Sequence, residues 1–69
     1  MKEQLIQLWE RKERDIKQAP RYFDRMVFFA QAFGALEMAM FTADNEQELI
    51  DLWNNEWRKR LEDLVYAEM

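Results

Sequence analysis

The chain has 69 residues, of which 49% are apolar and 35% charged, and its net charge is −4. This composition is too apolar for a disordered tail, and a single Gly and a single Pro are too few for a loop-rich fold. The absence of Cys and His excludes disulfide scaffolds, zinc fingers, thiol catalysis and imidazole acid–base catalysis. We therefore expect one all-α domain over residues 1–69 that is not an enzyme and uses no metal or cofactor.

The small size of the chain predicts that it associates with another molecule. A domain of about 60 residues buries only about 60% of the surface that its unfolded chain exposes, so a single copy is marginally stable. Small domains are commonly stabilised by disulfides, by a metal or by oligomerisation, and the composition leaves only the last of these. We expect a homodimer.

A first helix is predicted over residues 2–18, where Leu5, Ile6, Leu8, Trp9 and Ile16 share one broad side. Residues 10–15 include no apolar side chain, so this helix should be held weakly at its middle and should open first. A larger protein could then bind it. The surface predicted for that partner consists of Trp9, Arg11, Lys12 and Arg14.

A second helix is predicted over residues 20–41, with Pro20 as its first residue because proline suits the first turn of a helix. This helix is apolar on nearly every side, which indicates that it is surrounded. One row has heptad spacing, formed by Tyr22, Met26, Phe29, Phe33, Leu36 and Met40, and a neighbouring row is formed by Phe23, Val27, Ala30, Gly34 and Phe41. From these rows the predicted dimer interface takes Met26, Phe29, Ala30, Phe33, Gly34, Leu36 and Met40.

Two features of this second helix allow more than one interpretation. Glu37 interrupts the apolar pattern; it either shares a solvent-facing strip with Gln31 or is a buried carboxylate that needs a cation such as Arg25. Ala30 and Gly34 are small residues one turn apart. They either let a second copy approach closely or make room for a tryptophan of the third helix.

A third helix is predicted over residues 45–67, antiparallel to the second. Its start has the residues of a capping box, with Asp44 and Gln47 or Asn45 and Glu48 as the pair. Its core stripe is predicted to consist of Ile50, Trp53, Trp57, Leu61 and Leu64, widened by Leu49 and Val65. The fold class is therefore an all-α chain of three helices that dimerises into a bundle.

The function that these patterns favour is protein–protein interaction, as a small acidic adaptor or inhibitor. The acidic total argues against nucleic-acid binding, and the N-terminus lacks the apolar core of a signal peptide, which favours a cytoplasmic location. One alternative is a membrane protein with a single span over residues 26–43, disfavoured by Gln31 and Glu37. Another is a DNA mimic whose acidic residues imitate phosphates, namely Asp44, Glu46, Glu48, Asp51 and Glu56.

Overall fold

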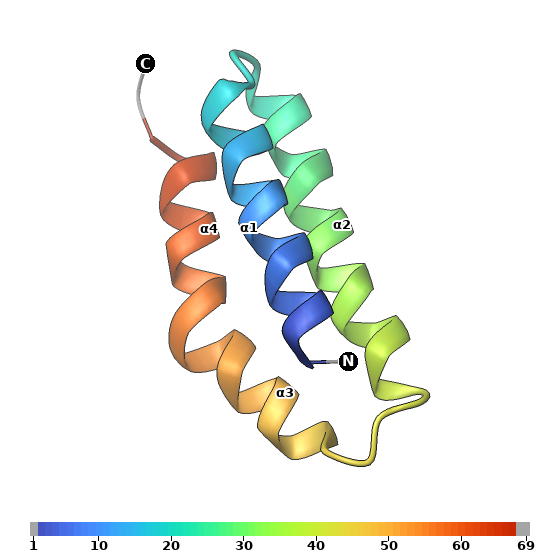
Figure 1. Ribbon diagram of the computed structural model, residues 1–69. Coiled ribbons are helices and arrows are strands. Elements are labelled where there is room, and N and C mark those ends of the chain that lie inside the picture. Colours follow the sequence, from blue (N-terminus) through green and yellow to red (C-terminus); the bar gives the residue numbers. More distant parts are fainter. Residues whose placement is uncertain (1, 68–69) are drawn as a thin grey trace.

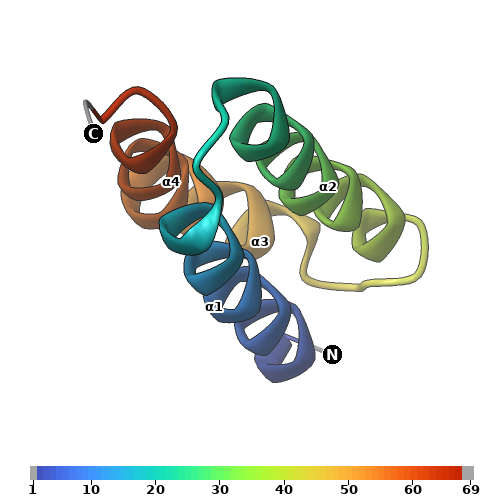
Figure 2. The same ribbon diagram turned by 90° about the horizontal axis from the view of Figure 1, so that it is seen from above.

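The computed structural model describes residues 2–67, which form three helical rods in up–down–up order (Figure 1). The first rod is α1 (Lys2–Gln18) and the second is α2 (Tyr22–Met40). The third consists of α3 (Glu46–Leu52), a π-helical turn η1 (Trp53–Trp57) and α4 (Arg58–Val65). Viewed along the rods, α1, α2 and α4 stand at the corners of a triangle (Figure 2). The prediction of an all-α chain of three helices is confirmed.

The break between the first two helices lies where Pro20 predicts it, but Pro20 is not the first residue of α2. Arg21 has an extended backbone, with φ −98° and ψ 137°, and caps the helix that begins at Tyr22. The extended backbone of Arg21 helps the chain to reverse direction between two antiparallel rods. Ala19 is buried within the turn, so the turn packs against the bundle.

The third rod contains a π turn that the sequence pattern does not predict. The backbone N–H of Arg58 bonds to the carbonyl of Trp53, five residues earlier, which is the hydrogen bond of a π-helix. The buried residues of this rod are four apart throughout: Leu49, Trp53, Trp57, Leu61 and Val65. In a pure α-helix such a row rotates around the axis, because a turn has about 3.6 residues. The wider π turn opposes that rotation and keeps the row facing inward, so Ile50 and Leu64 are only half-buried.

Trp9 lies at the centre of the core and has no exposed surface. Its ring centroid is 5.2 Å from that of Trp53 and 5.8 Å from that of Trp57. Its indole Nε1–H donates to the backbone carbonyl of Ala32 at 3.0 Å, so the one polar atom of the side chain is satisfied within the core. Trp9 therefore connects α1 to both of the other rods.

Charged side chains hold the middle of α1, which the sequence predicts to be loosely attached. Glu13 is buried and forms a bidentate ion pair with Arg60 of α4. Nε of Arg60 donates to one carboxylate oxygen of Glu13, and a terminal nitrogen donates to the other at 2.9 Å. This carboxylate raises the pKa of the Arg60 guanidinium above its usual range. The guanidinium also lies 4.5 Å from the ring centroid of Trp57. The prediction of a weakly held α1 did not count these contacts between helices.

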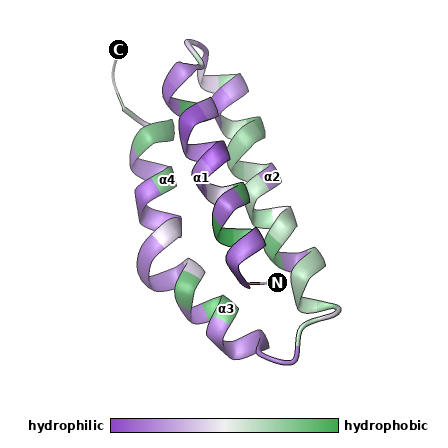
Figure 3. Ribbon diagram, viewed as in Figure 1, coloured by the Kyte–Doolittle hydropathy of each residue, from purple (hydrophilic) through white to green (hydrophobic). Residues whose placement is uncertain are grey.

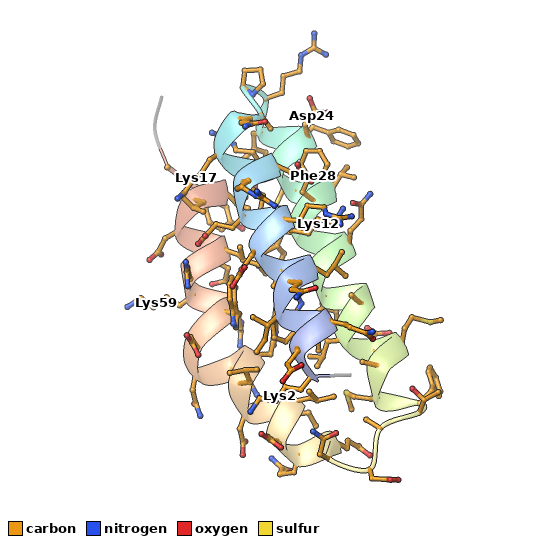
Figure 4. The ribbon with its side chains drawn as sticks, viewed as in Figure 1. Lys2, Lys12, Lys17, Asp24, Phe28 and Lys59 are labelled. Carbon is orange, nitrogen blue, oxygen red and sulfur yellow. The ribbon has the colours of Figure 1, made fainter. Side chains whose placement is uncertain are left out.

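The other side of α1 is joined to α2 by Lys12. Its Nζ donates to Oε1 of Gln31 at 2.6 Å and lies 5.5 Å from the ring centroid of Phe28, toward which Lys12 points in Figure 4. An ammonium group near an aromatic face is attracted by the electron density of the ring. The middle of α1 is thus tied to both neighbouring rods by cations rather than by apolar side chains.

The start of α1 meets the start of α3 through Lys2 and Glu48, whose Nζ and Oε1 are 2.5 Å apart. The hydrogen bond between them lowers the pKa of Glu48 and raises the pKa of Lys2. Asn45 is the N-cap of α3, one of the two positions that the sequence allows. The predicted capping box is not formed, since the amide of Asn45 donates to the side chain of Glu48 at 3.2 Å instead of accepting from the helix backbone.

Candidate interaction surface

The apolar side of α2 that faces away from the core is the candidate functional surface. Arg25, Ala32 and Leu36 are the buried residues of this helix and mark its inward side. On the opposite side lie residues separated by three or four positions, which a helix brings into one row. We call this row the outer face of α2; it consists of Phe23, Val27, Ala30, Gly34, Met38 and Phe41.

The large side chains of the outer face are strongly exposed. Phe23 is 74% exposed, Met38 70% and Phe41 83%, and Val27 is also exposed. Figure 3 shows the apolar character continuing along α2, whereas α1 and α4 alternate between polar and apolar residues. Scattered apolar residues on a surface are ordinary, but a continuous row of them usually marks an interaction site.

The middle of the outer face forms a shallow depression, because its residues are small. Ala30 is exposed, and a Cβ atom built on Gly34 would meet nothing within 4 Å. The small residues therefore do not make room for a tryptophan of the third rod, which was one of the two interpretations. The outer face has bulky ends and a shallow centre over Ala30 and Gly34.

Polar residues border the outer face on both sides. Glu37 and Gln31 are both exposed, which confirms the interpretation that they face solvent. Glu37 also lines a surface hollow with Met40, Phe41 and Glu46. The carboxylate of Glu37 therefore lies beside the outer face, near the C-terminal end of α2.

The two ends of α2 differ in charge. Near its start lie the exposed Arg21 and the half-buried Asp15 and Asp24, the last of which is labelled in Figure 4. Near its end lie Glu37, Asp44 and Glu46, all exposed, and residues 37–57 contain no Lys or Arg. The surface around α2 thus carries charges of both signs at its start and is acidic at its end.

Most of the residues predicted for the dimer interface pack within a single chain. Leu36 belongs to the core, so its assignment to the interface is wrong. The ring centroids of Phe29 and Phe33 lie 5.7 and 5.9 Å from that of Trp53, although Phe33 is still 44% exposed. Met26 and Met40 are partly buried against the same core. Of the predicted interface, only Ala30 and Gly34 lie on the outer face.

The structure corrects the predicted partner surface at Trp9. This residue is fully buried and cannot contact a partner while the bundle is intact. Arg11 and Arg14 are exposed on α1 as predicted, whereas Lys12 is half-buried and contacts α2. These four residues therefore do not form one accessible surface.

Sequence reasoning did not select Phe23, Val27, Met38 or Phe41 for the interface. Phe23, Val27 and Phe41 belong to the predicted row beside the heptad row, so the sequence pattern already groups these three together. Which of the two apolar rows faces the core depends on the side of α2 that the tryptophans of the third rod occupy. The periodicity of α2 alone does not predict that side. The contacts of Phe29 and Phe33 with Trp53 decide it.

Arg25 is a buried cation that the sequence interpretation did not place. One terminal nitrogen lies 3.5 Å from the carbonyl oxygen of Ala67, and its Nε has no hydrogen-bond partner among the residues that the structure describes. Nearby, the rings of Tyr22 and Tyr66 are 5.7 Å apart, and a hydrogen bond between them raises the pKa of Tyr22. These contacts join the start of α2 to the end of α4.

Two further classes of site can be compared with the structure. Within residues 2–67, acidic side chains do not gather in a group of three that could hold a metal ion. Over the same residues, no helix, α2 included, has the length and apolar character needed to cross a membrane. Comparison with protein-family models, with curated proteins and with solved structures finds no match for this chain.

Proposed function

We propose that this chain is a non-catalytic protein-interaction module that assembles as a homodimer through the outer face of α2. The observation that carries this proposal is the apolar row of Phe23, Val27, Ala30, Gly34, Met38 and Phe41, all of them exposed except the half-buried Gly34. Exposing such a row in water is unfavourable, and covering it is worth about 25 cal/mol for each Å² of apolar surface removed from water.

A second copy is the partner that the chain itself favours. A domain of this size has a small core and gains stability when another molecule covers its exposed apolar side chains. The outer face spans nearly the whole of α2, so two copies can cover one another along their length.

Sedimentation velocity over a micromolar concentration series tests this proposal. We expect the wild-type chain to shift from monomer to dimer as its concentration rises. Ala30→Glu places a charge at the centre of the outer face, where it would lack a partner in a dimer, and should leave a folded monomer. Circular dichroism should show unchanged helix content, because Ala30 is exposed in the single chain.

Gln7→Glu is the matched control, since it changes the net charge equally at an exposed position of α1. This variant should dimerise as the wild type does. A wild-type chain that stays monomeric over the whole concentration series would refute the proposal. Dimerisation of Ala30→Glu with wild-type affinity would also refute it, because the dimer would then use another surface.

A further inference from the structure

We infer that two copies pair with their α2 helices antiparallel and centred on position 32, so that Arg21 at the start of each α2 lies near the acidic end of the other. This inference rests on the proposed function, because it specifies how the outer face is occupied. It is argued from the order of side-chain sizes along the outer face, from the position of Gly34 and from the charge difference between the ends of α2.

From either end, the outer face begins with a phenylalanine and becomes small toward its centre. Phe23 and Phe41 lie nine residues on either side of position 32, and Ala30 and Gly34 lie two residues on either side. An antiparallel two-fold pairing about this position sets Phe23 opposite Phe41 of the second copy and Ala30 opposite its Gly34. Such an isologous interface uses one patch twice, which requires this kind of self-complementarity.

The remaining large residues of the outer face also match in this arrangement. Val27 lies five residues before position 32 and Met38 six residues after it. In such an antiparallel pair, the two-fold axis lies in the plane of the interface and perpendicular to both helices. Residues on one lateral edge of the outer face therefore meet residues on the same lateral edge of the second copy. Val27 and Met38 lie on the same side of the row, so Val27 of one copy packs against Met38 of the other.

Gly34 supports a close crossing of the two helices. Glycine within a helix costs about 1 kcal/mol relative to alanine. Nothing in the described part of the chain requires glycine here, since an added Cβ would meet nothing within 4 Å and its φ is not positive. A second helix crossing at Ala30 and Gly34 would use the missing side chain, because small residues let two helix backbones approach.

The charges near α2 favour the antiparallel over the parallel arrangement. Antiparallel pairing brings Arg21 of each copy to the end that holds Glu37, Asp44 and Glu46 in the other. Parallel pairing would instead place the two acidic ends together, and like charges across an interface disfavour association. Antiparallel pairing also sets the two helix dipoles in opposite directions.

Disulfide cross-linking measures the arrangement directly, because the chain has no native cysteine. Phe23→Cys and Phe41→Cys are prepared separately, mixed and oxidised. Antiparallel pairing predicts a cross-link between the two different variants. It predicts no cross-link of either variant to itself above background, since two copies of position 23 would lie about 27 Å apart along the helices, at about 1.5 Å for each of 18 residues. Disulfides require Cα atoms within about 7 Å.

Lys59→Cys measures the background of chance collisions, because Lys59 points away from the bundle on α4 (Figure 4). Preferential cross-linking of Phe23→Cys to itself would overturn the antiparallel arrangement while leaving the proposed dimer intact. Background cross-linking in every mixture, from chains that sedimentation shows to be dimers, would overturn the centring on position 32. A monomer in sedimentation refutes the proposed function instead, so the two failures are distinguishable.

A charge exchange tests the same arrangement without cysteine. Arg21→Glu should weaken the dimer about threefold to tenfold at low salt, because a favourable contact becomes repulsive in both halves of the interface. Adding Asp44→Arg should restore most of the lost affinity in the antiparallel arrangement. Both residues are exposed, so the fold should be unaffected. Failure of the second change to restore affinity would contradict the pairing of opposite ends.

Discussion

At the scale of single residues, Trp9 shows how one side chain can organise a small bundle. Its two rings contact Trp53 and Trp57, and its N–H reaches the carbonyl of Ala32. A residue that touches all three rods is a core residue, although its sequence context, before a fully polar stretch, also fits a recognition residue. The buried hydrogen bond explains why tryptophan can occupy this position without leaving a polar atom unsatisfied.

We expect Trp9→Ala to lower the free energy of unfolding by about 3–5 kcal/mol, the usual cost of a large cavity in a core. In a domain this small, that loss can be enough to unfold the chain. Urea denaturation followed by circular dichroism measures the change independently of tryptophan fluorescence. Tyr66→Ala serves as the control, since Tyr66 is exposed and its removal should cost far less. Equal effects of the two substitutions would contradict the central role of Trp9.

At the scale of elements, contacts between charged groups decide how α1 sits on the bundle. Glu13 is buried in the contact between α1 and α4, and Arg60 reaches it across the ring of Trp57. The carboxylate has little access to water, whereas the side chain of Arg60 remains 47% exposed. The two partners therefore depend on the ion pair to different extents.

This asymmetry predicts unequal effects of the two single substitutions on the free energy of unfolding. Arg60→Ala leaves the buried carboxylate of Glu13 unpaired and should cost about 2–4 kcal/mol. Glu13→Ala leaves a guanidinium that water can solvate and should cost less. A double-mutant cycle with both changes measures the coupling, which we expect to be about 1–2 kcal/mol. A larger loss for Glu13→Ala than for Arg60→Ala would show that the carboxylate is not the more dependent partner.

At the scale of the whole molecule, the described chain forms a rod of 39 × 17 × 16 Å with its apolar side chains divided between two places. One is the interior around Trp9, and the other is the outer face of α2. Because α1 packs against both α2 and α4, it is an integral part of the bundle. This packing argues against the expectation from the sequence that α1 opens before the other helices.

Hydrogen exchange measured by mass spectrometry tests whether α1 opens before the other helices. We expect the amides of residues 4–16 to be protected to a similar degree as those of residues 50–64, since both segments contain residues of one core. The turn at residues 41–45 should exchange fastest among the internal segments, because it lies outside the helices. Faster exchange over residues 4–16 than over residues 50–64 would restore the earlier expectation.

Local patterns in the sequence were enough to predict the helical class, the number of rods and most of their limits. Helix-favouring residues with a 3.6-residue period and a break before Pro20 predict these features, because they depend on interactions close along the chain. The sequence also determined that α2 carries more apolar surface than one chain can cover. Both conclusions follow from local pattern and composition alone.

The side of α2 that faces the core was set by tertiary packing. The π turn keeps Trp53 and Trp57 facing inward, and Trp53 receives Phe29 and Phe33. That choice leaves Phe23 and Phe41 on the surface. Likewise, the pairing of Glu13 with Arg60 joins residues 47 positions apart. A periodic pattern gives the faces of each helix but not their rotation against neighbouring helices, because that rotation is set by side-chain packing between distant segments.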